Sequence, residues 1–187
     1  MLFAPDSPVL LQRLRSATRP FHDALEQNDF NQMLLAGNVS PDTTTHFLAK
    51  LYGFLKPYEA QLDRHVFGPE WNIEQRHRAH LILQDLQPAS GLPLCPDMPP
   101  LATRAQLLGA MYVLEGSTLG GQVIARQLAK AGIDTRAYFM GYAERTGPMW
   151  KSFCQLLTQE STDENQAEIV ESASLTFQKL HAWINQP

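Results

Sequence analysis

Three glycines in the middle of one strongly helical segment constrain this chain more than any other feature of its sequence. Residues 105–131, AQLLGAMYVLEGSTLGGQVIARQLAKA, consist mainly of good helix formers, yet Gly116, Gly120 and Gly121 interrupt them. Each glycine costs about 1 kcal/mol relative to alanine in a helix interior, so the three together cost about 3 kcal/mol. Because Gly116 and Gly120 are four residues apart, they lie on one face, where the missing Cβ atoms let another group approach the main chain.

The glycines allow three interpretations. They could serve close packing against another helix, or a dimer of membrane-spanning helices, or contact with a flat ligand. Glu115, Gln122 and Arg126 are too polar for a membrane-spanning helix and argue against the second interpretation. The ligand interpretation predicts a kinked helix whose ligand-facing side extends back to Tyr112. The glycines alone leave packing and ligand contact open.

Apolar residues recur at helical spacing through most of the remaining chain, and alternating β patterns are scarce. The predicted helices comprise residues 8–27, 41–66, 72–86, 101–131, 146–159 and 163–185. Ser40 is a good N-cap ahead of Pro41, and Ser7 with Pro8 is a similar helix start. This pattern predicts an all-α fold in which several helices pack around one core.

Prolines mark the expected interruptions of this pattern. Pro20 and Pro57 lie inside predicted helices and should bend them. Residues 87–100, QPASGLPLCPDMPP, hold five prolines and a glycine and therefore predict a surface loop. This loop is too short and too central for a domain linker, so we expect one domain over residues 1–187.

Composition excludes several classes of function. The chain has 187 residues, of which 44% are hydrophobic, and a formal net charge of −4, so it is neither disordered nor basic enough for nucleic acid as its main partner. It has no apolar run of about 18 residues and no signal-peptide pattern, so we expect a cytoplasmic protein without a membrane span. Cys95 and Cys154 are far apart and suggest free thiols in a reducing compartment.

A histidine in the first predicted helix offers a candidate metal ligand. In LRSATRPFHDALE, residues 14–26, His22 follows Arg15 by seven residues, so both side chains point the same way about 10 Å apart along the helix axis. Heme has iron at its centre and two propionates at one edge, which suits a histidine and a basic residue at this spacing. A half-buried histidine with satisfied nitrogens is the alternative. That simpler role, or exposure to water, is expected for His46, His65, His77, His80 and His181.

Taken together, these segments resemble the heme oxygenase family. LRSATRPFHDALE is similar to the proximal helix that carries the iron-ligating histidine, and YVLEGSTLGGQVIARQL, residues 112–128, is similar to the distal helix, whose glycines lie over heme. GYAERTGPMWKSF, residues 141–153, resembles the bacterial branch, which includes the enzymes that accompany bacteriophytochromes. The final helix, with LTFQKLHAWI, is compatible, so the resemblance spans nearly the whole chain.

The resemblance implies a multi-helix bundle with heme between a proximal helix and a kinked distal helix. His22 would bind the iron as a neutral imidazole, and Glu26 could accept a hydrogen bond from its other nitrogen. Gly116, Ser117 and Gly120 would take part in catalysis. The residues implied for heme binding are Arg15, His22, Tyr112, Gly116, Gly120, Gly121 and, more weakly, Lys151. Ser117 stands where many heme oxygenases have an aspartate, so the distal water network must be held differently here.

The reaction that the resemblance implies is the opening of heme b, both substrate and cofactor, to biliverdin, carbon monoxide and ferrous iron. The alpha isomer of biliverdin is the default expectation. The reaction consumes O₂ and electrons. The glycine cluster lacks the G-x-G-x-x-G pattern and follows no strand, so electrons would come from an external donor such as a ferredoxin or a flavin reductase. A bacteriophytochrome is a possible recipient of the product.

Three alternatives remain open at this point. A heme carrier or sensor would bind heme without turnover, and Ser117 keeps that possibility open. A di-iron carboxylate bundle needs two E-x-x-H motifs, whereas the chain has one, Glu74 to His77. A thiaminase-like helical enzyme needs a catalytic cysteine, and neither Cys95 nor Cys154 has an identifiable partner.

Overall fold

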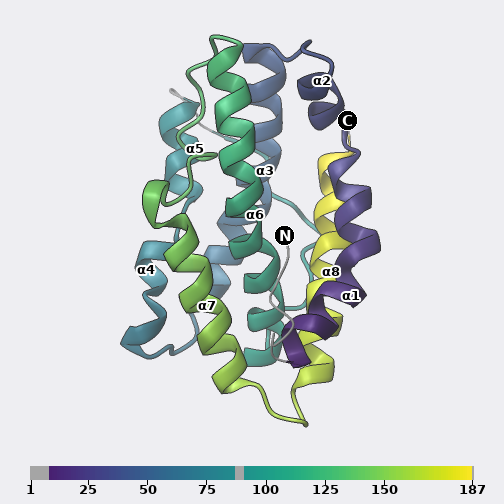
Figure 1. Cartoon of the computed structure of the whole chain (residues 1–187), viewed down its shortest axis with the longest axis vertical. Coiled ribbons are helices and arrows are strands. Elements are labelled where there is room, and N and C mark those ends of the chain that lie inside the picture. The colour runs from purple at the N-terminus through teal and green to yellow at the C-terminus, as the bar shows by residue number, and fades with distance from the viewer. Residues whose placement is uncertain (1–8, 87–90, 187) are drawn as a thin grey trace.

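Every regular element in the part of the chain that the structure describes is a helix. The computed structural model describes residues 9–86 and 91–186 (Figure 1). In chain order the elements are α1 (Val9–Glu26), α2 (Asp29–Leu35), α3 (Pro41–Leu62), η1 (Pro69–Trp71), α4 (Ile73–Arg76), α5 (Ala79–Asp85), α6 (Arg104–Lys130), η2 (Ala143–Arg145), α7 (Thr146–Glu160) and α8 (Gln166–Ile184), where η denotes a 3₁₀ helix. The all-α fold class predicted from the sequence is therefore confirmed.

Capping boxes begin two of the long helices. Ahead of α3, the Ser40 hydroxyl accepts a hydrogen bond from the main-chain N–H of Thr43, and the Thr43 side chain accepts one from the N–H of Ser40. Thr103 and Gln106 make the same reciprocal pair at the start of α6. Each box satisfies N–H groups that have no partner inside the helix. The predicted helix start at Ser40 is confirmed, whereas Ser7 and Pro8 lie outside the described residues.

Local breaks occur at fewer places than the glycines and prolines suggest. α6 is helical throughout residues 104–130, its four glycines included, so any kink there does not interrupt the helix. α1 and α3 likewise continue through Pro20 and Pro57. The short helix α2 was not predicted. It begins after Asn28, whose side chain accepts a hydrogen bond from the Asn31 N–H at 3.0 Å.

The single helix predicted over residues 72–86 is wrong. The chain forms α4 and α5 here instead, directly after η1, with an extended main chain at His77 (φ −67°, ψ 128°). The break is held by a carboxylate from α3: Glu59 Oε1 accepts hydrogen bonds from the N–H groups of Arg78, at 2.6 Å, and Ala79, at 2.9 Å. A buried acid from a distant element thus caps α5, and no local sequence pattern reports it.

α8 is the helix that relates the two predicted heme-facing helices to each other. It packs along both α1 and α6, which have far fewer contacts with one another (Figure 1). Gly109 makes close approach of α6 and α8 possible, because a Cβ at this position would lie 2.7 Å from the Cβ of Ser172. The Ser172 hydroxyl donates to the carbonyl of Gln106 at 2.7 Å and joins the two helices at the same level. α8 therefore determines the spacing between α1 and α6.

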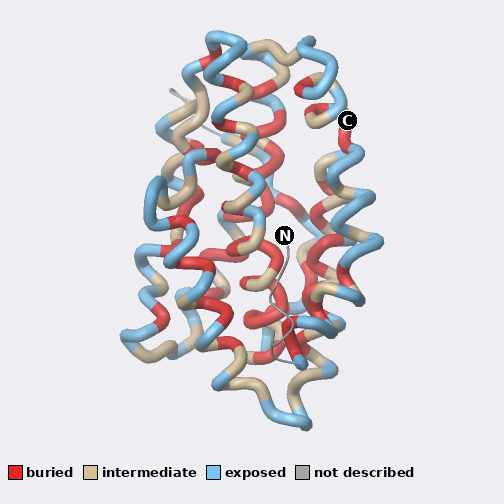
Figure 2. The backbone as a smooth tube through the Cα atoms, in the orientation of Figure 1, coloured by how far each residue is buried: buried red, intermediate tan, exposed pale blue. Residues whose placement is uncertain are grey.

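The described core is one continuous cluster of buried side chains drawn from α1, α2, α3, η1, α5, α6, α7 and α8. Figure 2 shows the buried positions along the inward faces of the long helices. The proline-rich loop, described from residue 91 onward, is non-helical as predicted, and it packs on this core. The Cys95 N–H donates to the carbonyl of Gly53 at 2.9 Å, and a Cβ on Gly53 would lie 2.8 Å from the Trp183 ring.

Candidate functional site

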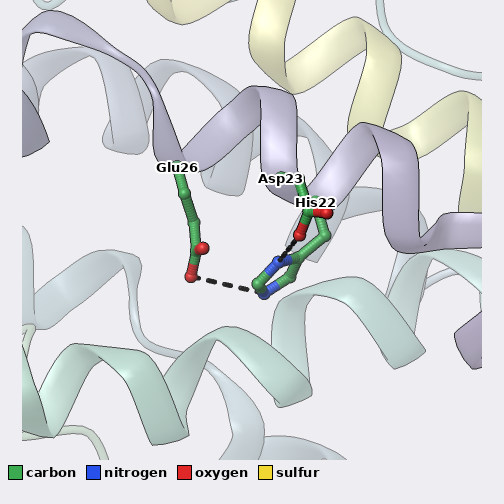
Figure 3. Close-up of side chains that lie close together, drawn as sticks. All are labelled: His22, Asp23 and Glu26. Atoms are coloured by element: carbon green, nitrogen blue, oxygen red, sulfur yellow. Dashed lines mark ion pairs between the residues drawn. The ribbon is translucent and has the colours of Figure 1, made fainter.

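The predicted iron ligand, His22, lies on α1 with 52% of its side chain exposed. Its imidazole extends from α1 toward a helix drawn in the pale green of α6 (Figure 3). Nδ1 is 3.7 Å from a carboxylate oxygen of Asp23, and Nε2 is 3.7 Å from one of Glu26. Both distances are too long for hydrogen bonds, so neither carboxylate engages a ring nitrogen of this half-exposed side chain.

The ring of His22 is oriented by a contact with α8. Its centroid lies 5.8 Å from that of Phe177 in an edge-on arrangement, and Phe177 itself is buried. The hydrogen bond expected between Glu26 and His22 is not formed, but the carboxylate lies close enough to form it after a small rotation. His22, Asp23 and Glu26 form the only group of three potential metal ligands found among the described residues, and all three are exposed.

Tyr112 connects α6 to α1 at the other end of the predicted site. Its ring lies 5.7 Å from that of Trp150, and burial raises the pKa of its hydroxyl, while nearby Thr18 and Arg15 of α1 act in the opposite direction. Arg15 therefore lies within electrostatic range of Tyr112, and the sequence proposed both residues for the same ligand. Lys151 lies on the exposed side of α7, next to Trp150.

Gly116, Gly120 and Gly121 of α6 differ in their surroundings. A Cβ on Gly120 would meet no atom within 4 Å, so the main chain there borders open space. A Cβ on Gly116 would lie 3.5 Å from the Trp150 ring, which is ordinary contact. At Gly121 it would lie 2.9 Å from the main-chain oxygen of Phe139, so this glycine is required by packing within the protein. The face of α6 that carries Gly116 and Gly120 is therefore the one that a ligand can approach.

Ser117 is exposed, and its hydroxyl donates to the carbonyl of Leu114 at 2.7 Å, one turn back in α6. The hydroxyl proton is therefore engaged by the helix itself. The oxygen retains lone pairs that can accept a hydrogen bond. A serine in this arrangement can hold a water molecule but cannot supply an acid as strong as a carboxyl group.

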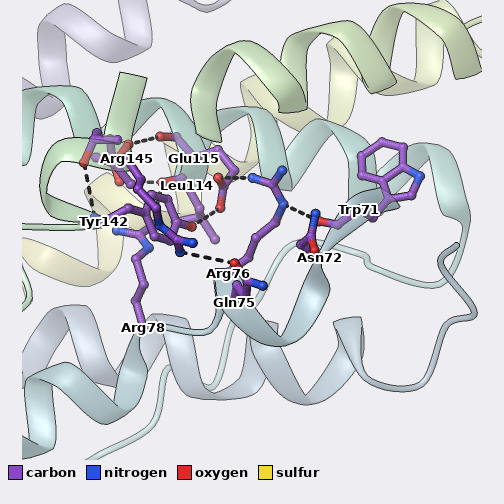
Figure 4. Close-up of polar contacts among 12 residues, drawn as sticks. Trp71, Asn72, Gln75, Arg76, Arg78, Leu114, Glu115, Tyr142 and Arg145 are labelled. Atoms are coloured by element: carbon purple, nitrogen blue, oxygen red, sulfur yellow. Dashed lines mark hydrogen bonds and ion pairs between the residues drawn. The ribbon is translucent and has the colours of Figure 1, made fainter. Parts of the chain in front are cut away.

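Sequence reasoning missed a cluster of buried polar side chains directly behind this part of α6 (Figure 4). Glu115, with 4% of its side chain exposed, forms an ion pair with Arg76 and accepts a hydrogen bond from the Tyr142 hydroxyl at 2.7 Å. Burial and the neighbouring Glu115 carboxylate raise the pKa of Tyr142, so its hydroxyl stays protonated as a donor at neutral pH. The available signal was the helical register: Glu115 follows the core residues Leu108 and Met111 by seven and four positions, and a charge there requires a buried partner.

A shallow hollow of about 240 Å³ lies elsewhere on the molecule. Its lining comes from α3, α5 and the loop that follows α5: Tyr52, Lys56, Leu83, Gly91, Leu92 and Leu94. It shares no residue with the predicted site, and its described lining contains no histidine, cysteine or carboxylate. We therefore place the candidate site between α1 and α6.

The structure also tests two alternative chemistries. Glu74 and His77 do not belong to any potential metal-binding group in the described residues, and His77 Nε2 instead lies 3.1 Å from Asp63. Burial raises the pKa of Cys154 to about 12 and raises the pKa of Cys95 as well. A catalytic thiol needs a lowered pKa and access to solvent, so neither cysteine suits a nucleophile.

None of the helices in the described part of the chain is both long enough and apolar enough to cross a bilayer.

Comparison with known proteins gives one consistent result. The sequence model of the heme oxygenase family matches residues 9–91 and 96–186. A heme oxygenase of Xanthomonas campestris pv. campestris is 30% identical over 157 residues, which cover 80% of this chain and 93% of that protein.

Solved structures with a similar fold include heme oxygenase-1 of the cyanobacterium Synechocystis in complex with heme, with a TM-score of 0.76 and 18% identity over 94% of this chain and 90% of that one. The heme oxygenase of Leptospira interrogans has a TM-score of 0.75 and 17% identity, covering 94% and 98% of the two chains. The NO- and CO-bound heme oxygenase of Neisseria meningitidis has a TM-score of 0.73 and 21% identity, covering 94% and 89%.

Proposed function

The chain belongs to the heme oxygenase family and is an enzyme that degrades heme, and from this premise we propose that heme b is held between α1 and α6 and opened to biliverdin, with release of carbon monoxide and ferrous iron. The observation that carries the placement is the pairing of two accessible groups on different helices. His22 extends from α1 with about half of its side chain exposed, and the main chain at Gly120 of α6 borders open space.

His22 is the residue we assign to the iron. A neutral imidazole donates a lone pair from one nitrogen, and its second nitrogen needs an acceptor to fix the ring. Asp23 lies 3.7 Å from Nδ1 and Glu26 lies 3.7 Å from Nε2, so one of the two carboxylates can become that acceptor after a small rotation, and Phe177 limits rotation of the ring from the α8 side. When bound, heme supplies both the redox-active iron and the ring that is oxidised.

The opposite wall of the site is the main chain of α6. Without Cβ atoms, Gly116 and Gly120 let backbone groups come close to a flat ligand, and they leave room for ordered water. Ser117 takes the place of the aspartate found in many relatives: its oxygen accepts from a water molecule, while its proton stays with Leu114. Gly121 contributes through packing against Phe139. Protons thus reach the site through ordered water, which backbone groups and Ser117 hold in place.

The propionates of heme are assigned to Arg15 and Tyr112. Arg15 provides a cation on α1 and Tyr112 a hydroxyl on α6, and the two lie near each other at the end of the site away from Gly120. Lys151, exposed on α7, is a weaker candidate for the same role. This end of the site therefore fixes how far heme enters and how it is rotated, on which the expected alpha isomer depends.

The chain has no nucleotide-binding motif of its own, and we expect its electrons from an external ferredoxin or flavin reductase in the cytoplasm. A bacteriophytochrome is a candidate recipient of biliverdin. These partners follow from the kinship of the sequence with the bacterial branch of the family.

The decisive experiment is a titration of the purified protein with hemin, followed by turnover. We expect one hemin per chain and a histidine-type absorption spectrum. Addition of O₂ with ascorbate, or with a reductase, should remove the Soret band and yield biliverdin, whose isomer chromatography identifies. Absence of stoichiometric hemin uptake would overturn the placement. A stable complex that resists oxidation under these conditions would contradict turnover by this chain.

A further inference from the structure

The segment of α6 that faces the proposed heme is tied from behind by charged side chains. Glu115 and Arg76 have only 4% and 1% of their side chains exposed, and they form an ion pair there. The Tyr142 hydroxyl donates to the second carboxylate oxygen at 2.7 Å, and Arg76 Nε donates to the carbonyl of Trp71 at 2.7 Å. Glu115 therefore joins α6 to the α4 region and to the loop before α7 (Figure 4).

A second arginine holds the main chain of the same turn. Arg78 Nη2 donates to the carbonyl oxygen of Leu114 at 2.6 Å, and its guanidinium lies between the rings of Tyr138 and Tyr142, at 5.3 and 5.8 Å from their centroids. The main-chain N–H of Arg78 is itself fixed by Glu59 of α3 at 2.6 Å. Arg78 thus connects α3 to the backbone of α6 through groups that are all buried.

This turn of α6 carries more hydrogen bonds than a helix needs. The Leu114 carbonyl accepts from the Ser117 hydroxyl as well as from Arg78, and the Glu115 carbonyl accepts from the Thr118 hydroxyl at 2.6 Å. Side chains that bond to helix carbonyls compete with the main-chain ladder and let the helix bend there. The turn that includes Gly116 is therefore locally adjustable, and its position depends on what holds it from behind.

Stability alone is a weak explanation for these buried charges. A buried ion pair can often be replaced by apolar side chains of similar volume without loss of stability, because desolvation offsets the attraction between the charges. Directional bonds do what apolar packing cannot: they fix one backbone atom at one distance. Leu114 and Glu115 immediately precede Gly116, so their positions transfer directly to the face that borders the ligand.

We propose that Arg76, Arg78, Glu115 and Tyr142, called here the brace, are positioning residues that set how closely the Leu114–Thr118 turn of α6 approaches bound heme. The proposal rests on the placement of heme between α1 and α6 given above. The brace does not touch heme. It acts through the backbone of α6, so its loss should change turnover of bound heme more than affinity for heme.

Two matched sets of variants test the brace. Tyr142→Phe removes the hydroxyl that bonds Glu115, whereas Tyr138→Phe leaves a ring over Arg78 and removes a hydroxyl that does not contact Glu115. Arg78→Met removes the bond to the Leu114 carbonyl, and Arg78→Lys restores a charge and one donor. Each variant is characterised by its hemin dissociation constant, its kcat per bound hemin, and amide hydrogen exchange over residues 114–120 of the heme-free protein.

We expect Arg78→Met to lower kcat per bound hemin between about 10- and 100-fold, with a hemin dissociation constant close to that of the wild type and faster exchange in residues 114–120. Tyr142→Phe should lower kcat per bound hemin by a smaller factor than Arg78→Met. Arg78→Lys should recover part of the kcat that Arg78→Met loses, and Tyr138→Phe should have the kcat of the wild type. A purely structural role would lower the amount of folded, hemin-binding protein and leave kcat per bound hemin unchanged.

The proposal is overturned if Arg78→Met and Tyr142→Phe turn over bound hemin at the wild-type rate, or if Tyr138→Phe is impaired as much as Tyr142→Phe. Failure of the wild-type protein to bind hemin would instead overturn the placement of heme itself, so the two failures are distinguishable. If Arg78→Met does not fold, the Tyr142→Phe and Tyr138→Phe pair decides alone.

Discussion

The imidazole of His22 on α1 meets the ring of Phe177 on α8 edge to face, with 5.8 Å between the two ring centroids. Phe177 is buried, whereas about half of the His22 side chain is exposed, so the contact restrains the imidazole from one side only. α8 supplies no iron ligand in our assignment, but it orients His22, the residue on α1 that does. This arrangement leads to the first two predictions.

Replacing His22 with alanine should abolish histidine ligation of bound hemin, because no other imidazole belongs to the potential metal group on this face of α1. Absorption and electron paramagnetic resonance spectra of the ferric complex measure this directly. The control is His46→Ala, since His46 is an exposed histidine on α3 outside the site. A His22→Ala complex with wild-type spectra would move the ligand elsewhere.

Replacing Phe177 with leucine should leave histidine ligation in place but weaken it, because the ring loses its edge-on neighbour while α8 keeps an apolar side chain. Removing a group that orients a metal ligand commonly costs about 10- to 100-fold in affinity. The hemin dissociation constant and the width of the ligand-field signals report the change. Unaltered affinity in Phe177→Leu would show that the contact does not orient His22.

Gly120 and Gly121 are neighbours in sequence but should respond in opposite ways to a side chain. Gly120→Ala should raise the free energy of unfolding of the heme-free protein by up to about 1 kcal/mol, because alanine is the better helix former and no atom lies within 4 Å of the new Cβ. Gly121→Ala should lower it by about 1–3 kcal/mol, since the new Cβ would crowd the carbonyl oxygen of Phe139. Urea unfolding measures both.

Hemin binding separates the roles of the same two positions. Gly120→Leu should leave the helix intact and weaken hemin binding, because the side chain enters the space assigned to heme. Folded Gly121→Ala should bind hemin nearly as well as the wild type, since its Cβ points at Phe139. Wild-type binding and turnover by Gly120→Leu would remove the argument for close approach of the α6 main chain.

Removing one partner of the buried Arg76–Glu115 ion pair should strongly destabilise the protein. Arg76→Met leaves the Glu115 carboxylate, only 4% exposed, without its cation, and should lower the free energy of unfolding by about 3–5 kcal/mol. The double variant Arg76→Met with Glu115→Leu should recover much of that loss. Arg19→Ala is the control: its pair with Asp23 is exposed and contributes about 0.5 kcal/mol or less. Thermal and urea unfolding measure these losses. The prediction would be wrong if Arg76→Met lowered the free energy of unfolding no more than Arg19→Ala does.

The thiol of Cys154 should be inert in the folded protein. Burial raises its pKa from 9.0 to about 12, so the folded chain keeps this proton at pH values where the unfolded chain loses it. This contribution to stability is complete below pH 9 and declines as the pH rises from about 9 to about 12. Cys154→Ala should therefore flatten the loss of stability over that interval.

Alkylation checks the same property chemically. Near pH 9, where a free thiol is about half ionised, iodoacetamide should modify Cys154 only after urea unfolds the chain, as mass spectrometry can show. Cys95, whose pKa burial also raises, should behave in the same way. Rapid modification of Cys154 in the native protein would mean that this part of α7 opens readily.

Helices whose signals are local were predictable. The Ser40 and Thr103 caps act within one turn, and apolar spacing in α3, α6, α7 and α8 reports the buried face of each helix directly. The break at His77 was not predictable in this way, because the group that holds it open is Glu59, contributed by another helix. Residues 72–86 satisfy a helical pattern and nevertheless do not form one helix.

The same distinction applies to the site. The spacing of Gly116 and Gly120 and the position of His22 follow from helical geometry, which depends only on neighbouring residues, and so the sequence by itself determined these two helices and which residues share a face of each. The tertiary structure decided that Gly121 packs against Phe139, that Phe177 orients His22, and that Arg78 holds the Leu114 carbonyl. These partners lie 18 to 155 residues apart along the chain, and a hydrogen bond or a van der Waals contact depends on distance in space, which helical periodicity does not encode.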